Sequence, residues 1–353
     1  NLLASKQASK QASKQRLVGL DVFRIAAAFV ILLFHSAIHI NCNYGILQPF
    51  IMMGAVFMTG FFLLSGYSLF YAHGETDFSE LVNVKQFYIK RAVGIMPLYY
   101  VVALLYILFI GKESLVQNTV IAPTEIMGIQ SVFSSLFTVT HNGGTWFISC
   151  ILLCYSIFPF AAMCIRQMTM RGKLSLFFLC MFVLLYAPFV EKIFHTQSIY
   201  SNPFFRILEF IMGCILASVQ VNFEECKVGK LLLDKKVIFM EGMMLIVGIS
   251  IAYQLGIARG NYMLYSWVCL PLFCLMIPAL AYIKRNHKGD SIFVRIILYL
   301  SAISYSFFLA QFFIWPVMNI LNIQNNIIKI ILCIALCTVI SILLHEFIEK
   351  PSK

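Results

Sequence analysis

About ten stretches of this 353-residue chain are apolar for the length that a helix needs to cross a lipid bilayer. Hydrophobic residues make up 61% of the chain and charged residues only 12%, so most of it suits lipid rather than water. Backbone polar groups inside lipid must bond to one another, and the sequence lacks the alternation typical of membrane β-strands. The sequence therefore predicts an all-α, polytopic membrane helix bundle of about ten transmembrane helices, over 17–40, 50–72, 92–110, 146–165, 174–190, 204–220, 237–258, 262–283, 294–321 and 327–347.

Lysine and arginine residues are distributed unevenly among the segments between these stretches. Cytoplasmic loops retain basic residues, so the asymmetry predicts a multi-pass protein of the cell (plasma) membrane with both termini in the cytoplasm. The net charge of +11 follows from this topology, and because the cations are spread among loops we expect no nucleic-acid partner. The segments expected in the cytoplasm hold Lys6, Lys10, Lys14, Arg16, Lys85, Lys90, Arg91, Arg166, Arg171, Lys173, Lys227, Lys230, Lys235, Lys236, Lys284, Arg285, Lys288, Lys350 and Lys353, whereas the opposite loops hold Lys112, Lys192 and Arg259.

The first fifteen residues contain Ala-Ser-Lys-Gln three times in succession and have no apolar face. We expect residues 1–15 to be a disordered tail or an artificial addition, and residues 16–353 to form a single transmembrane domain. Most of the eleven cysteines lie within apolar stretches and none forms a Cys-x-x-Cys pair, which favours buried free thiols over disulfides or metal ligands.

Two ionisable residues lie eleven positions apart within the first apolar stretch. Arg24 and His35 fall on nearly the same face of a helix, roughly 16 Å apart along its axis. Ionisable groups in lipid are costly and usually functional, although Arg24 could instead pair with Asp21 or reach the headgroups, and His35 could serve helix packing. His39 lies one turn beyond His35, but a metal site would need a third ligand, so we expect no metal and place His39 on an outer path for an acceptor or in bonds to nearby asparagines.

Further candidates lie on later stretches. Ser65 could allow close helix packing or the approach of a substrate, and Tyr305 is expected inside a helix, where its hydroxyl needs a partner. Arg206 and Glu209 are neighbours at i, i+3, which favours a self-compensating scaffold pair, with a role at an acceptor entrance as the alternative.

The stretch before the fourth apolar segment has an amphipathic approach, a Gly-Gly break at 143–144 and an aromatic residue, Trp146, at the expected membrane entry. Residues 134–146 could form a re-entrant or interfacial segment over a cavity. Trp146 itself is expected to be an interfacial anchor, with a platform for a sugar as the alternative.

Seven short motifs follow one another along the chain. They are Gly19-Leu-Asp21-x-x-Arg24-x10-His35, Phe61-Phe-Leu-Leu-Ser65-Gly66-Tyr67, Phe87-x-x-Lys90-Arg91-x5-Pro97-x-Tyr99, Thr145-Trp146-Phe147, Pro203-x-x-Arg206-x-x-Glu209-Phe210-x-x-Gly213, Ser304-Tyr305-Ser306-x-x-Leu309 and Glu346-x-x-Glu349-Lys350-Pro351. In their order and spacing these motifs resemble the acyltransferase type 3 family of bacterial multi-pass membrane acyltransferases, over residues 16–351. Two positions depart from the family pattern: Lys90-Arg91 stands where paired arginines are common, and Gln311 stands where a histidine is frequent.

This resemblance implies transfer of an acyl group, usually acetyl, from cytoplasmic acyl-CoA to a hydroxyl of a glycan or lipid-linked envelope precursor. Arg24, Lys90 and Arg91 would hold the phosphates of the donor at the inner membrane boundary. His35 would accept the proton of the attacking hydroxyl or carry the acyl group covalently, and the sequence leaves both routes open. Membrane lipids would be the remaining partners, and no metal is implied.

Two other classes of protein compete with this interpretation. A transporter or flippase of an envelope precursor could use intramembrane Arg24, His35 and Arg206, but acidic residues for a proton relay are scarce and no internal repeat is evident. A sensor or assembly subunit with a degenerate acyltransferase body is suggested by Gln311, but the presence of Arg24 and His35 opposes it.

The charge asymmetry makes the topology testable. We expect reporter tags inserted at residue 226 or 353 to be cytoplasmic, and tags at 43, 118 or 323 to be outside, because the basic residues favour the same side at every pair of loops. Accessibility to a membrane-impermeant label checks each position. An outside signal from both termini would contradict the predicted topology.

Overall fold

The computed structural model describes residues 16–111, 114–133, 144–194, 199–225, 234–256, 264–283 and 291–352. Across these ranges the ordered elements are helices and no strand occurs, which confirms the predicted all-α bundle. Nine helices in the described ranges are long and apolar enough to cross a membrane, and two shorter apolar helices accompany them. The chain is a multi-pass membrane protein.

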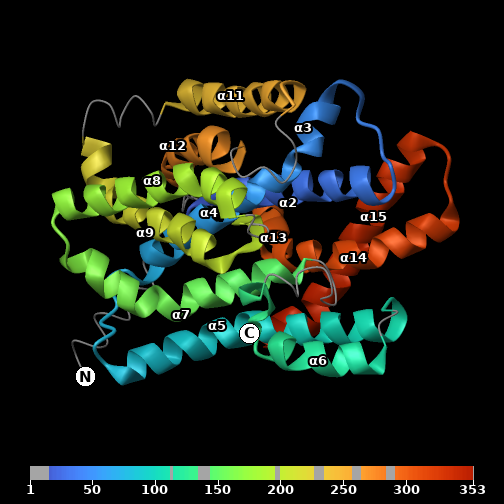
Figure 1. The fold of residues 1–353 in the computed structure, drawn as a ribbon, viewed down its shortest axis with the longest axis horizontal. Helices are drawn as coiled ribbons and strands as arrows, with labels where there is room; N and C mark the ends of the chain where they lie inside the picture. The colour runs from blue at the N-terminus through green and yellow to red at the C-terminus, as the bar shows by residue number, and fades with distance from the viewer. Residues whose placement is uncertain are drawn as a thin grey trace.

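The apolar helices, long and short, follow the order of the predicted stretches (Figure 1). They are α2 (Val18–His39), α4 (Phe57–His73), α5 (Leu81–Phe109), α7 (Thr145–Gln167), α8 (Met170–Phe194), α9 (Pro203–Glu225), α11 (Lys235–Gln254), α12 (Leu270–Ala281), α13 (Ile292–Ala302), α14 (Ser304–Leu321) and α15 (Asn326–Leu344). Short elements accompany them, namely α3 (Gln48–Met52), α6 (Leu115–Ile126), the 3-10 turns at 45–47, 54–56, 130–132 and 199–201, the π-helical turns Leu264–Cys269 and His345–Glu349, and α16 (Lys350–Ser352).

The predicted continuous helix over 294–321 is wrong, because the structure divides it into α13 and α14 at Ile303. The hydroxyl of Ser304 donates a 2.8 Å hydrogen bond to the carbonyl of Ser301, and such local bonds compete with the helical ladder. The side chain of Ser301 is itself bonded to α2. The break therefore lies where the chain contacts the first helix.

Two further elements differ from the sequence prediction. Helix α5 begins at Leu81, eleven residues before the predicted span, so Lys90 and Arg91 lie on the helix rather than in a loop before it. Hydropathy marks the apolar part of a helix, whereas the helix itself continues into polar sequence. Part of the stretch between the third and fourth predicted spans forms α6, which receives hydrogen bonds at its end from two side chains of α5, Tyr99 and Tyr100.

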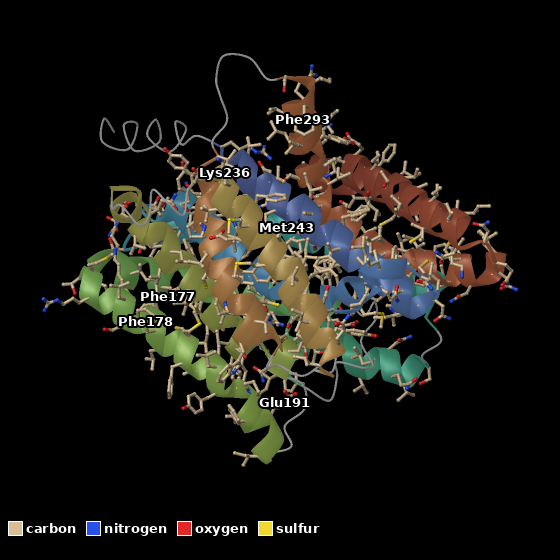
Figure 2. All side chains as sticks on the ribbon, turned by 90° about the horizontal axis from the view of Figure 1, so that it is seen from above. Phe177, Phe178, Glu191, Lys236, Met243 and Phe293 are labelled. Carbon is tan, nitrogen blue, oxygen red and sulfur yellow. The ribbon has the colours of Figure 1, made fainter. Side chains whose placement is uncertain are left out.

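The outer helices expose large apolar side chains. Phe178 of α8 is 63% exposed and Met243 of α11 is 45% exposed, and Figure 2 labels both residues. Figure 1 places α11 over α12 on one side of the bundle and α5 with α6 on the opposite side. Apolar surfaces of this kind suit contact with lipid tails rather than water.

Among the described helices, α4 and α9 make the most extensive contact, and their backbones approach each other closely. A Cβ atom at Gly66 would overlap the carbonyl oxygen of Phe210, and one at Gly213 would overlap the carbonyl oxygen of Leu63. The two backbones therefore touch at a crossing where only glycine fits, as is common between membrane helices. The thiol of Cys214 also donates a 3.4 Å hydrogen bond to the carbonyl of Gly66.

This crossing predicts which glycine substitution the fold tolerates. We expect Gly213→Ala to lower the stability of the purified protein by about 1–3 kcal/mol, because the added methyl group must push the two helices apart. Unfolding in an anionic detergent titration measures the change. Gly242→Ala in α11 is the matched control, because a Cβ atom there meets no other atom within 4 Å. Equal midpoints for both variants would show that the crossing is not tightly packed.

Candidate functional site

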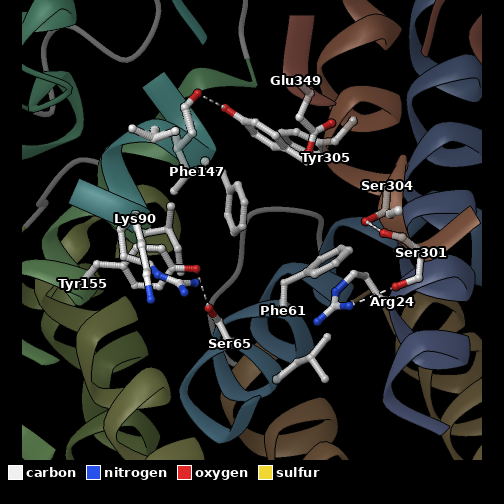
Figure 3. Close-up of a pocket in the computed structure, with 18 of the residues that line it drawn as sticks. Arg24, Phe61, Ser65, Lys90, Phe147, Tyr155, Ser301, Ser304, Tyr305 and Glu349 are labelled. Carbon is white, nitrogen blue, oxygen red and sulfur yellow. Dashed lines mark hydrogen bonds between the residues drawn. The ribbon is translucent and has the colours of Figure 1, made fainter. Parts of the chain in front are cut away.

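A cavity of about 720 Å³ lies between α2, α4, α5, α7, α13, α14 and the π-helical turn after α15 (Figure 3). Its size is within the range of small-molecule sites, about 300–1,000 Å³. Five of the residues singled out from the sequence line it, although they come from four different helices: Arg24, Ser65, Lys90, Arg91 and Tyr305. The fold therefore brings together side chains as much as 281 positions apart in sequence (305 − 24).

Asp21 fixes the guanidinium of Arg24 at one wall of the cavity. Arg24 donates 3.0 Å hydrogen bonds to the carboxylate of Asp21 and to the hydroxyl of Ser301, and Ser301 in turn donates a 2.6 Å bond to Asp21. Arg16 adds a 2.9 Å ion pair to the same carboxylate. The i, i+3 pairing of Arg24 with Asp21 is confirmed, and Asp21 itself lies behind the cavity lining with only 4% of its surface exposed.

The second basic group enters from α5. The guanidinium carbon of Arg91 lies 5.7 Å from the ring centre of Phe87 and 5.9 Å from that of Tyr155, so two aromatic faces hold it. Its buried Nε atom has no hydrogen-bond partner in the described part of the chain. Lys90 is exposed beside it, and Figure 3 shows Lys90 and Arg24 on either side of Phe61.

Ser65 and its neighbour Gly66 on α4 have different surroundings, one at the cavity and the other at a helix contact. The hydroxyl of Ser65 faces the cavity and lies 3.3 Å from the hydroxyl of Tyr155, whereas Gly66 packs against α9. Tyr305 finds the partner that its buried hydroxyl requires, because it donates a 3.1 Å hydrogen bond to the carbonyl of Ile95.

A buried carboxylate that the sequence analysis did not single out also lines the cavity. Glu349 is 2% exposed, accepts a 2.5 Å hydrogen bond from Ser306, and lies 2.9 Å from Nδ1 of His345. The terminal motif contains Glu349, and His345 precedes it by one helical turn. The i, i+4 spacing of His345 and Glu349 could have predicted this pair from the sequence. The pair was missed because it lies at the end of a strongly apolar stretch, which was interpreted only as a membrane span.

His35, on α2, does not line the cavity. It contacts α14 farther along that helix than the residues of α14 that line the cavity. Its Nδ1 atom is 2.8 Å from Oε1 of Gln311, and its ring centre is 5.5 Å from that of Phe312. Phe308, which does line the cavity, precedes these two partners by three and four residues. Successive turns of one helix face therefore lead from the cavity to His35.

Aromatic side chains of α7 and α14 meet in the cavity lining. Phe147 and Phe308 both line the cavity, and their ring centres are 5.5 Å apart. On the far side of His35, the exposed His39 stacks on Trp315 with ring centres 5.5 Å apart and an angle of 17° between the planes. His39 lies outside the cavity lining, and the described residues contain no group of three or more metal-ligating side chains.

Arg206 and Glu209 are enclosed in the bundle rather than placed at the cavity. Arg206 is fully buried and makes bonds of 2.7 and 2.9 Å to Glu209, 2.7 Å to the carbonyl of Tyr200 and 3.0 Å to Thr59. Three aromatic rings surround its guanidinium, the nearest being Tyr200 at 4.6 Å. This geometry fits the scaffold interpretation, because every bond compensates a buried charge.

Trp146 supplies one of those three rings, at 5.6 Å from the guanidinium of Arg206. It is 7% exposed, so the prediction of an interfacial anchor is wrong: the indole is enclosed against the buried cation instead of being exposed at the surface of the bundle. It also lies outside the cavity lining. The predicted re-entrant segment over 134–146 falls mostly on residues 134–143, outside the described residues.

Comparison with known proteins gives one match. The model of a family described as an acyltransferase domain, acyltransferase type 3, matches residues 17–346, which is nearly the whole chain. The match spans every described helix from α2 to α15 and includes each sequence motif except the terminal one, of which it contains only Glu346. Neither the curated proteins nor the solved structures gave a match.

Proposed function

Because the chain belongs to the acyltransferase type 3 family, we propose that this membrane acyltransferase moves an acyl group, acetyl in the first instance, from cytoplasmic acyl-CoA to a hydroxyl group. The acceptor is a glycan or lipid-linked envelope precursor outside the membrane. The observation that carries the proposal is the cavity, which combines a basic mouth with a helix face leading to His35.

The basic residues of the cavity suit the donor. Acyl-CoA carries a diphosphate and a further phosphate at its nucleotide end, and ionised hydrogen bonds from arginine and lysine are the strongest that a protein offers to phosphate. Arg16, Arg24, Lys90 and Arg91 supply four cations in one cavity. Arg91 is held between two rings and Arg24 by Asp21, so both guanidinium groups are ordered before the donor binds.

The position of these cations supports entry of the donor from the cytoplasm. Arg16 and Lys90 are exposed and belong to segments whose charge favours the cytoplasmic side. We therefore place the mouth of the cavity and both termini in the cytoplasm, and the protein in the plasma membrane. Residues 16–353 form one catalytic domain in this proposal, with residues 1–15 outside it.

His35 is assigned as the general base. The pantetheine arm extends from the phosphates along α14 towards His35, roughly 16 Å beyond Arg24 along the axis of α2. The acceptor hydroxyl arrives from the outer side, past His39 and Trp315, and attacks the thioester carbonyl while the imidazole of His35 takes its proton. Phe147 and Phe308, whose ring centres are 5.5 Å apart in the cavity lining, would contact the arm along this route.

The first test of this proposal concerns the donor. We expect Arg91→Ala to weaken acyl-CoA binding by about 1.5–3 kcal/mol, the scale of a hydrogen bond to a charged group. Calorimetry on the purified protein measures the change, which should shrink at high salt because salt already screens the wild-type interaction. Arg171→Ala, on an exposed position of α8 outside the cavity, is the control. Unchanged affinity in Arg91→Ala would remove Arg91 from the donor site.

The second test concerns the chemistry. We expect His35→Ala to lower acyl transfer about 10²- to 10⁴-fold while donor binding stays nearly intact, because the imidazole acts on the proton of the acceptor. Liposomes with labelled acetyl-CoA inside and candidate glycans outside provide the assay. Efficient transfer by His35→Ala would refute the assignment of the base. Absence of both CoA binding and acyl product with the wild-type protein would instead favour a transporter.

A further inference from the structure

The partner of His35 determines which of its nitrogen atoms can act as a base. Gln311 is fully buried, and its amide oxygen Oε1 lies 2.8 Å from Nδ1 of His35. An amide oxygen only accepts hydrogen bonds, so with this orientation of the amide Nδ1 must carry the proton. The lone pair of the neutral imidazole is then on Nε2.

Two buried hydrogen-bond donors beside His35 have no acceptor. They are Nε2 of Gln311 and Nε1 of Trp315, and neither atom has a hydrogen-bond partner within the described ranges. Trp315 is 5% exposed, and its ring centre lies 6.5 Å from that of His35. Buried donors are nearly always satisfied in native proteins, so two of them one helical turn apart next to a histidine indicate a ligand acceptor atom.

We propose, on the basis of the function proposed above, that Gln311 is the positioning residue of His35 and that Gln311 and Trp315 together donate hydrogen bonds to the carbonyl oxygen of the thioester. Oε1 of Gln311 holds the imidazole in the tautomer with Nε2 as the base. Nε2 of Gln311 and Nε1 of Trp315 bind the carbonyl oxygen, which gains negative charge as the hydroxyl adds.

The step balances with the groups named. The acceptor oxygen bonds to the thioester carbon, its proton passes to Nε2 of His35, and the carbonyl π electrons move to the oxygen held by the two N–H donors. The tetrahedral intermediate then collapses, the carbon–sulfur bond breaks, and the departing thiolate takes the proton from the imidazolium. The products are an ester and free CoA, and His35 is again neutral.

A glutamine in this position stabilises the tautomer without adding a charge. Three residues of α14 contact His35, namely Gln311, Phe312 and Trp315, and none of these three titrates near neutral pH. The titratable groups around this end of α2 are His39 on α2, Cys42 and Tyr44 in the loop that follows, and Cys333 and Lys329 on α15, where Lys329 bonds to the carbonyl of Ile40. The Gln311→Glu substitution would therefore place a carboxylate at the position whose side-chain oxygen now lies 2.8 Å from Nδ1 of His35.

The first experiment changes the partner of Nδ1. Gln311→Met removes both the acceptor and the donor at similar volume, and we expect its kcat to fall about 100-fold or more while the KM for acetyl-CoA changes little. Gln311→Glu keeps an acceptor for Nδ1–H and adds a charge that stabilises the imidazolium. We expect the acid limb of its kcat/KM profile to move to higher pH by about one unit or more, a shift that a purely structural role would not produce.

The second experiment removes the other donor. Trp315→Phe keeps an aromatic ring but deletes the indole N–H, and we expect kcat to fall about 10- to 1,000-fold, the range for one donor to an oxyanion. Trp267→Phe is the matched control, because its N–H donates a 2.8 Å hydrogen bond to the carbonyl of Leu185 away from His35. Equal kcat values for the two variants would overturn the role of Trp315.

His35→Ala, assayed in parallel, separates the failure of this inference from the failure of the proposed function. If His35→Ala retains full activity, the assignment of His35 as the base in the proposed function fails, and this inference fails with it. If the wild-type protein neither binds CoA nor forms acyl product, the proposed function as a whole fails. If His35→Ala is inactive but Gln311→Met and Trp315→Phe keep wild-type kcat and pH profiles, only the present inference fails. Acetyl-CoA binding by each variant shows that the variant is folded. Gln311→Met tests the proposal even if the Gln311→Glu variant does not fold.

Discussion

The contact between α4 and α9 is the constraint on which the rest of the bundle depends. The helices run in the same direction, because Thr59 meets Glu209 at one end of the pair and Tyr67 bonds to Gln220 at the other. Between these points Gly66 and Gly213 let the two backbones touch. Membrane helices gain little from the hydrophobic effect, so packing and hydrogen bonds of this kind hold them together. Removing one partner of the buried Arg206–Glu209 pair would typically cost about 3–5 kcal/mol.

That contact also determines which side of α4 faces the cavity. Leu63 and Gly66 face α9, whereas Phe61, Leu64 and Ser65 turn towards the space between α4, α5 and α14. The polar network of Arg206 is closed off behind this wall, so its charges serve the packing of the pair and not the cavity. The two arginines, Arg24 and Arg206, thus occupy different environments although both lie within predicted spans.

The sequence predicted well those features that depend on local spacing. The pairing of Arg24 with Asp21 and of Arg206 with Glu209 follows from i, i+3 geometry, and the apolar stretches followed the helices closely. Hydropathy missed the break at Ile303, since the bond that ends α13 is formed by serine hydroxyls and a contact with α2. The interfacial prediction for Trp146 failed for a different reason. Aromatic residues with a polar atom favour membrane interfaces on average, but here the indole packs on the buried cation of Arg206.

The contact of His35 with Gln311 could not be predicted, because it joins residues 276 positions apart whose relation depends on how α2 crosses α14. Once known, it explains the arrangement of charge along α2. The cations lie towards the N-terminal end of α2, where Arg24 keeps 30% of its side chain exposed and hydration limits the cost of charge.

Around the imidazole of His35, farther from that end of α2, the partners on α14 are an amide and aromatic rings. A neutral partner is the less costly choice there, since an unpaired carboxylate in lipid would have to be neutralised by a proton or a second cation. A glutamine at position 311 is thus compatible with a site in which the imidazole alone carries the proton through the proposed reaction.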